Sequence, residues 1–127
     1  MTAYVLDTNV LIFLSAEPEV LPNRVRRALA DHGNELTASV VSIYEVGNKH
    51  RLGKLATSPD ALVRVSRAFG VSFLPLGDQV CLRASMLEWS HRDPWDRIIA
   101  AQALALGAPL VSSDRAFDAV PGLTRLW

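Results

Sequence analysis

This 127-residue sequence has a single cysteine, no excess of one charge sign and no long apolar run. Cys81 is the one cysteine, which excludes a disulfide scaffold; we expect it to be a small buried hydrophobe in a reducing compartment. Lysine and arginine number 13, as do aspartate and glutamate, so overall charge gives no attraction to nucleic acid. Runs such as residues 10–14 are far shorter than the roughly 20 residues that span a bilayer, and the first residues do not resemble a signal peptide. We therefore expect a cytoplasmic protein without membrane contact.

Apolar residues make up 50% of the sequence and charged residues 20%, which is enough to fill a core and excludes disorder. The length matches one domain, and we expect a single domain over residues 1–127. Strands are predicted at residues 4–6, 36–38, 71–74, 110–112 and 123–127. Helices are predicted after residue 9, from 22 to 31 or 32 with Gly33 as cap, after Ser39 or Ser42, and over 59–69, 78–89 and 94–106. This alternation predicts an α/β fold, a parallel sheet with helices on both faces.

Four carboxylates stand where predicted strands end or where the following helices begin. Asp7 and Asp114 follow strands, whereas Glu45 and Asp96 lie near helix starts. These positions meet at one edge of a parallel sheet, the edge where ligands bind. We therefore expect the four side chains to converge there.

Such convergence has an electrostatic cost. Two like charges about 4 Å apart repel by roughly 4 kcal/mol at an effective dielectric near 20. A folded protein therefore either protonates one of them or binds a cation. Oxygen ligands suit Mg²⁺, and Thr8, Asn9 and Ser112 add neutral oxygens beside the acids. The few scattered histidines argue against zinc.

Each acid except Asp7 also has a structural interpretation. Glu45 would complete a capping box begun by Ser42, or pair with Lys49 one turn later. Asp93 is better explained as the N-cap of the helix beginning at residue 94 than as a ligand, and Asp114 would cap a short helix. Asp7 follows a buried strand and has little structural reason to be there.

Four blocks of this sequence resemble the PIN-domain family and, more narrowly, the VapC toxins of bacterial toxin–antitoxin pairs. The blocks are VLDTNVL at 5–11, SIYEV at 42–46, HRDPWDRIIAAQA at 91–103 and VSSDRAF at 111–117. Ser112 stands where the family usually has threonine, which keeps the hydroxyl, and Trp95 where it often has phenylalanine.

The resemblance implies a five-stranded parallel sheet and a Mg²⁺- or Mn²⁺-dependent endoribonuclease in which metal ions orient and acidify a water. Its catalytic, metal-binding acids fall on Asp7, Glu45, Asp96 and Asp114. Asp7 and Asp96 are the best candidates for direct ligands, and the separate roles of the other two stay open.

The resemblance also implies three partners: an RNA substrate, a cognate antitoxin protein and a second copy of the chain. Lys49, Arg51 and Lys54 either contact RNA backbone or form the solvated end of a helix. Arg97 is predicted to form an ion pair with Asp96, and His91 to be a loop residue.

Two alternatives stay open. A Mg²⁺-binding phosphoacceptor domain of the receiver kind would also have a parallel sheet and an acidic pocket. Its acidic pair near the first strand is not matched, because Asp7 is solitary, and no lysine follows Lys54. The second alternative is a catalytically inactive PIN-like domain that binds RNA or a partner; the intact set of acids argues against it.

Overall fold

The computed structural model describes all residues, 1–127. Its five strands form one fully parallel sheet in the order β3-β2-β1-β4-β5. They are β1 (Ala3–Leu6), β2 (Glu35–Ser39), β3 (Val71–Leu74), β4 (Leu110–Val111) and β5 (Arg125–Leu126). The predicted α/β class is confirmed. Receiver domains have the strand order 2-1-3-4-5, so the phosphoacceptor alternative is wrong.

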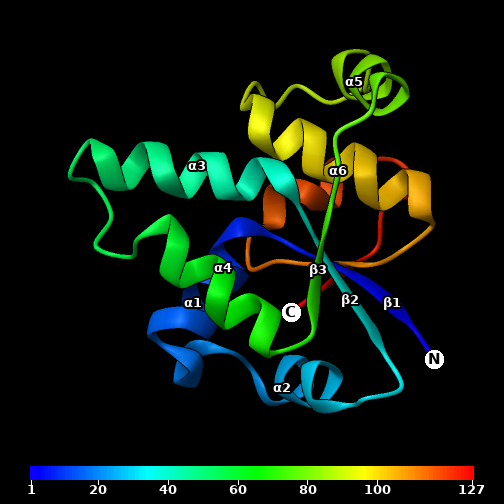
Figure 1. Cartoon of the computed structure of the whole chain (residues 1–127). Coiled ribbons are helices and arrows are strands. Elements are labelled where there is room, and N and C mark those ends of the chain that lie inside the picture. The colour runs from blue at the N-terminus through cyan, green and yellow to red at the C-terminus, as the bar shows by residue number, and fades with distance from the viewer.

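Helices cover both faces of the sheet. In Figure 1, α1 (Thr8–Ala16), α2 (Asn23–Ala30) and α4 (Pro59–Ala68) lie below it, and α3 (Val40–Arg51), α5 (Asp78–Ser85) and α6 (Pro94–Leu106) lie above it. Two short 3₁₀ helices, η1 (Pro18–Val20) and η2 (Arg115–Ala119), complete the fold. No helix is both long and apolar enough to cross a bilayer.

The core is divided by the sheet into two clusters, because successive strand residues point to opposite faces. Leu6 of β1 and Val111 of β4 belong to a cluster of 13 buried residues built mainly with α1 and α2, to which α3 and α4 add one residue each. Val5 and Leu110, one position earlier, belong to a cluster of 9 with α6 and η2. Both faces of the central strands are therefore buried.

Capping residues fix where α3 begins and where α4 and α6 end. Ser39, and not Ser42, caps α3 by accepting a hydrogen bond from the Val41 amide. Glu45 consequently lies beyond the first turn of α3, and the predicted capping box is wrong. Gly70 closes α4 with φ +87° and Gly107 closes α6 with φ +61°, a left-handed conformation that side chains other than glycine rarely adopt.

Three local predictions are wrong. Gly33 does not cap α2, because the Asp31 carboxylate accepts from the Gly33 amide in a turn that follows the helix end at Ala30. Helix α5 ends at Ser85 and does not reach Trp89. Cys81 is exposed, because α5 packs chiefly on α6 and its outer face is open to solvent.

Candidate metal centre

The strand order reverses between β1 and β4, and the first candidate residue lies at this point. In parallel sheets such a reversal opens the crevice where ligands bind. Asp7 directly follows β1 and is only 4% exposed. One oxygen of Asp7, Oδ1, accepts from the Thr8 amide at 2.8 Å and thereby caps α1; the other, Oδ2, accepts from the Ser112 hydroxyl at 2.7 Å. Asp7 therefore has a structural role as the N-cap of α1, and the expectation that it has little structural reason to be there is wrong.

Asp7 is held in an environment that resists ionisation. Burial raises the pKa of Asp7 to about 6, and repulsion from Asp96 and Glu45 adds to that rise. The hydrogen bonds from Ser112 and Thr8 lower the pKa and oppose these effects only in part. The structure therefore brings three of the four predicted acids within electrostatic reach of one another.

One carboxylate oxygen of Glu45 has a hydrogen-bond partner and the other has none. Its side chain is on α3 and the residue is 8% exposed. The Oε2 atom accepts from Lys49 Nζ at 2.8 Å, which confirms the predicted one-turn pairing. The Oε1 atom is buried without a hydrogen-bond partner. A buried acceptor left in this way requires an explanation, and a bound cation is one.

Asp96, in the first turn of α6, is joined to His91. Asp96 Oδ2 lies 2.6 Å from His91 Nε2. Burial raises the pKa of Asp96, as does repulsion from Asp93 and Glu45, while His91 opposes the rise. Asp93 caps α6 as predicted, because its Oδ1 accepts from the Trp95 and Asp96 amides. Ligand atoms of His91, Asp93 and Asp96 all lie within 4.8 Å of one another.

Asp114 is connected to Asp7 through Ser112. Its backbone amide donates to Ser112 Oγ at 3.0 Å, and the same hydroxyl donates to Asp7. Asp114 Oδ1 accepts from the Ala116 amide and caps η2, as predicted. Asp114 therefore lies on the β4 side of the centre and is half-buried.

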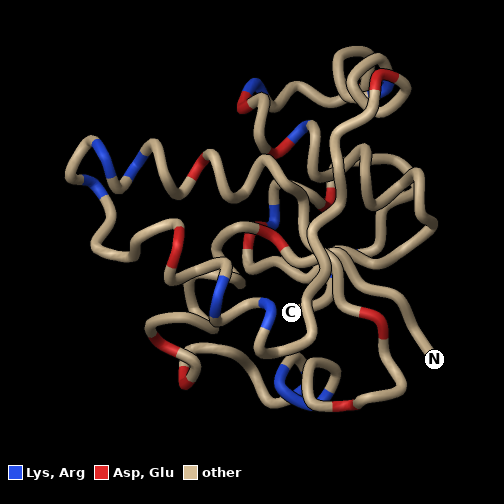
Figure 2. The backbone as a smooth tube through the Cα atoms, in the orientation of Figure 1, with Lys and Arg blue, Asp and Glu red and all other residues tan.

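The remaining polar residues fall into an inner and an outer group. Thr8 Oγ1 lies 2.8 Å from Ser42 Oγ, and both are buried beside the acids, whereas Asn9 is exposed. In Figure 2, one acidic segment lies on α3 and others lie around the start of α6, and basic segments gather at the far end of α3. Lys49 reaches inward from that end, and its hydrogen bond to Glu45 raises the pKa of Lys49.

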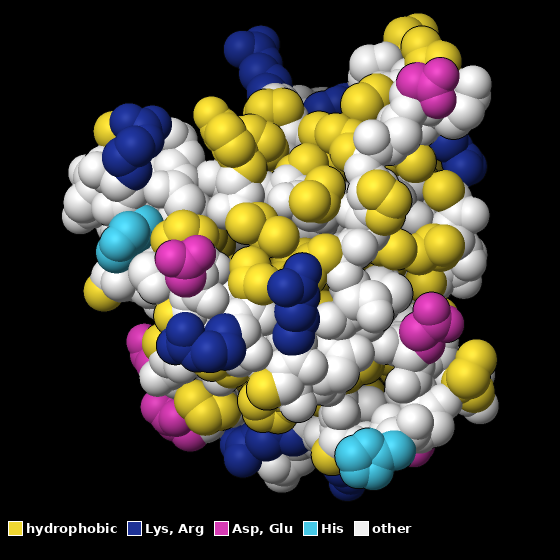
Figure 3. Space-filling model, viewed as in Figure 1, with side chains coloured by type: hydrophobic (Ala, Val, Ile, Leu, Met, Phe, Trp, Pro, Cys, Tyr) yellow, Lys and Arg dark blue, Asp and Glu magenta, His cyan; other side chains and the backbone are white.

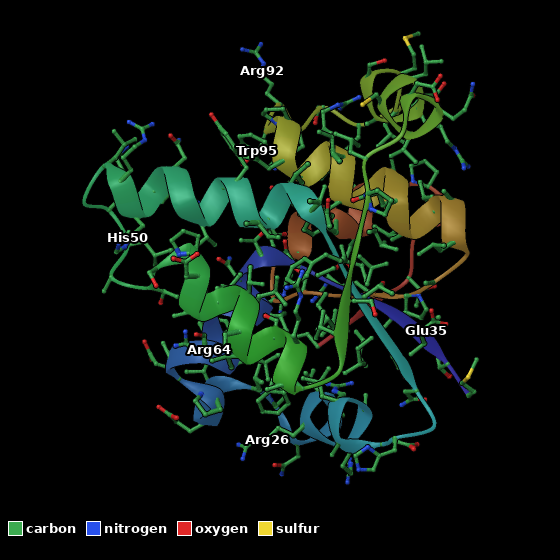
Figure 4. The ribbon with its side chains drawn as sticks, viewed as in Figure 1. Arg26, Glu35, His50, Arg64, Arg92 and Trp95 are labelled. Carbon is green, nitrogen blue, oxygen red and sulfur yellow. The ribbon has the colours of Figure 1, made fainter.

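Arg51 and Lys54, the other residues predicted to contact RNA, lie farther out on the same end. Arg51 donates to Asn48 on α3, and Lys54 lies exposed in the turn that follows the helix. Figure 4 shows Trp95 lying over α3 and Arg92 pointing away from the protein. The Trp95 ring packs on Tyr44 with centroids 5.5 Å apart.

Sequence reasoning missed the connections of two residues. Arg97 was expected to pair with Asp96, but its guanidinium instead donates to the backbone carbonyls of Ala84, Ser85, Leu87, Trp89 and His91. The predicted ion pair is wrong because the guanidinium donates to carbonyls at the end of α5 and in the irregular segment before α6. His91 is a loop residue as predicted, yet it contacts Asp96; its place five residues before an acid was the only signal.

A family model described as the PIN domain matches residues 4–123. The chain belongs to the PIN domain family. Members of this family are nucleases, which hydrolyse phosphodiester bonds, and they typically use divalent metal ions. No match was found among curated proteins.

Solved structures show the same PIN fold along nearly the whole chain. A chain of Salmonella typhimurium VapBC bound to DNA is 21% identical, with 99% of this chain and 98% of that chain covered and a TM-score of 0.72. A chain of Rickettsia felis VapBC2, bound to a DNA fragment from its promoter, is 16% identical, with 98% of each chain covered and a TM-score of 0.71. VapBC-1 of nontypeable Haemophilus influenzae is 23% identical, with 98% and 97% covered and a TM-score of 0.68.

The residues of this PIN domain suit a divalent cation on two structural grounds. Glu45 offers a buried oxygen without a partner, and Asp7 is held among carboxylates that repel it. The donors are nearly all oxygens, the ligands that Mg²⁺ takes. The assignment of individual residues to metal binding or catalysis stays a prediction.

Proposed function

We propose that this PIN domain is a Mg²⁺- or Mn²⁺-dependent endoribonuclease that acts as the toxin of a type II toxin–antitoxin pair. The observation that carries the metal dependence is the buried Glu45 Oε1 atom, which has no partner and lies beside two acids with raised pKa values. The likeness to chains from VapBC complexes supports the toxin assignment.

Asp7, Glu45 and Asp96 are the residues that would hold the cation, with Asp114 bound directly or through water. When bound, a divalent cation supplies a Lewis acid that offsets the charge gathering on the phosphate during hydrolysis. The chain itself holds the carboxylate oxygens in place before the cation binds. Ser112 and the Thr8 amide orient the Asp7 carboxylate. Lys49 donates to Oε2 of Glu45, which leaves Oε1 available to the cation.

The RNA substrate would approach along α3. Lys49 and Arg51 lie in the last turn of that helix and Lys54 in the turn that follows it; we assign all three to the RNA backbone, whose phosphates attract basic side chains. The Lys49 side chain is 46% exposed, so it can contact RNA as well as Glu45. Arg51 and Lys54 are exposed to solvent.

The protein partners are a cognate antitoxin and a second copy of the chain. Figure 3 shows apolar side chains gathered on the face that α3, β3 and α6 share. The exposed large hydrophobic residues on or next to this face include Val40, Tyr44 and Leu76. An exposed apolar surface of this kind is typical of protein interaction sites.

The decisive experiment measures cleavage of a single-stranded RNA by the purified chain with EDTA, Mg²⁺ or Mn²⁺. We expect cleavage only with a divalent ion, and a fall of about 100-fold or more in Asp7→Asn, because this variant removes a ligand charge while keeping the cap. Asp31→Asn is the matched control, since Asp31 lies before β2 at the opposite edge of the sheet, and it should cleave like the wild type.

The same assay distinguishes the remaining alternative. Cleavage without metal that persists in Asp7→Asn would overturn the proposed chemistry. Tight RNA binding without cleavage in either metal would instead support the inactive PIN-like domain. Circular dichroism of Asp7→Asn ensures that a loss of activity is not a loss of fold.

A further inference from the structure

His91 is held against Asp96 by contacts on two sides. Its Nε2 atom lies 2.6 Å from Asp96 Oδ2. When Asp96 is ionised, as a metal-binding carboxylate is, its oxygens can only accept, and the hydrogen bond then requires the proton on Nε2. The imidazole stacks on the ring of Trp89, with centroids 4.5 Å apart and an interplanar angle of 26°. Trp89 in turn packs on Phe117, a fully buried core residue, with centroids 5.4 Å apart.

The chain around His91 is fixed by Arg97. Residues 86–93 contain no helix or strand, and such segments are ordinarily mobile. The Arg97 guanidinium donates to the carbonyls of Trp89 at 2.7 Å, Leu87 at 2.8 Å and His91 at 3.1 Å. Arg97 follows Asp96 directly in α6, so one helical turn carries both the acid and the group that positions its histidine.

We propose that His91 is a positioning residue: its Nε2–H fixes the orientation of the Asp96 carboxylate and leaves Oδ1 of Asp96 free for the cation. This inference rests on the metal centre of the proposed function. Partners that hydrogen-bond a metal-binding carboxylate pre-orient it, and their loss typically weakens metal affinity about 10- to 100-fold. Arg97 and Trp89 build the support that keeps His91 in place.

The test is a Mn²⁺ titration of the full metal-free chain, with free Mn²⁺ followed by electron paramagnetic resonance. His91→Phe keeps a ring on Trp89 but removes the donor, and we expect its Mn²⁺ dissociation constant to rise about 10- to 100-fold. His91→Gln keeps an N–H donor at similar reach and should bind Mn²⁺ nearly as tightly as the wild type. His91→Leu is a second variant without a donor, in case the phenylalanine does not pack.

Two further variants separate the inference from the function on which it rests. Asp96→Asn removes the proposed ligand and should abolish tight Mn²⁺ binding, whereas His32→Leu, in the loop before β2, should leave it unchanged. Failure of the wild type to bind Mn²⁺ would overturn the metal centre itself. Loss of binding in Asp96→Asn with unchanged affinity in folded His91→Phe and His91→Leu would overturn only the role of His91. A directly bound imidazole nitrogen in the spin-echo spectrum of the Mn²⁺ complex would make His91 a ligand and overturn the positioning role.

Discussion

Polar side chains at the two edges of the sheet lie in opposite environments: they are hydrogen-bonded and near solvent where the strands begin, and buried among like charges where the strands end. Before the strands begin, Asn34 accepts from the Thr2 amide and donates to the Ala28 carbonyl, and Asp31 accepts from the Gly33 amide. Glu35, labelled in Figure 4 at the start of β2, is exposed and far from Trp95. Where the strands end, Asp7 and Glu45 are buried and repel each other.

The difference shows what each edge is built for. Hydrogen-bonded groups at the first edge, which are partly or fully exposed, each contribute a little stability. Buried carboxylates at the second edge repel one another and are unfavourable in the metal-free chain, which is the cost expected of an edge that binds a cation as proposed above. Three changes test the comparison.

The largest expected effect is the pH dependence of the metal-free protein. The pKa of Asp7 is about 6 in the folded chain against its ordinary 3.8, so between these values the folded state keeps a proton that the unfolded state has lost. The free energy of unfolding should therefore fall as the pH rises from about 4 to 7, by about 3 kcal/mol from Asp7 alone.

Urea denaturation in EDTA at each pH measures this fall. Asp7→Asn should flatten the pH dependence and be more stable than the wild type near pH 7, while Asp31→Asn should follow the wild type. Equal slopes in Asp7→Asn and the wild type would mean that the two edges do not differ in this way.

A smaller effect is expected for Ser112→Ala. This hydroxyl donates to Asp7 and accepts from the Asp114 amide, and it is fully buried. Its loss should reduce the free energy of unfolding by about 1–3 kcal/mol and raise the pKa of Asp7 further, because the hydrogen bond lowers it. Denaturation and carboxyl NMR titration measure the two effects. Ser113→Ala, at the exposed neighbour, is the control, and equal effects in both variants would contradict the link.

The smallest effect is expected at the other edge. Asn34→Ala loses two hydrogen bonds at a partly exposed site and should be destabilised by about 1 kcal/mol. Its Mn²⁺ affinity and its RNA cleavage should match the wild type, since nothing at this edge reaches the acids. A change in Mn²⁺ affinity would show that the two edges are coupled.

Local patterns predicted what depends on neighbours in sequence. Short apolar runs predicted all five strands, and helical spacing predicted the pair of Glu45 and Lys49. The N-cap at Asp93 followed from the proline after it. These features depend on residues only a few positions apart.

Long-range contacts were not predictable in the same way. The Ser112 hydroxyl meets Asp7 across 105 positions because β4 lies beside β1, and strand order cannot be read from one sequence. The exposure of Cys81 depends on what packs over α5. The contacts of Arg97 depend on where carbonyls of an irregular segment fall in space, which no residue pattern encodes.

Asp7 has a structural role and a proposed role in the metal centre, and together they limit which substitutions could remove the proposed activity without unfolding the chain. The same carboxylate begins α1 and belongs to the acidic centre. Asparagine starts helices about as well as aspartate, whereas alanine does so poorly. Under the proposed function, a homologous chain with asparagine at this position is therefore expected to keep the fold and to lack RNA cleavage.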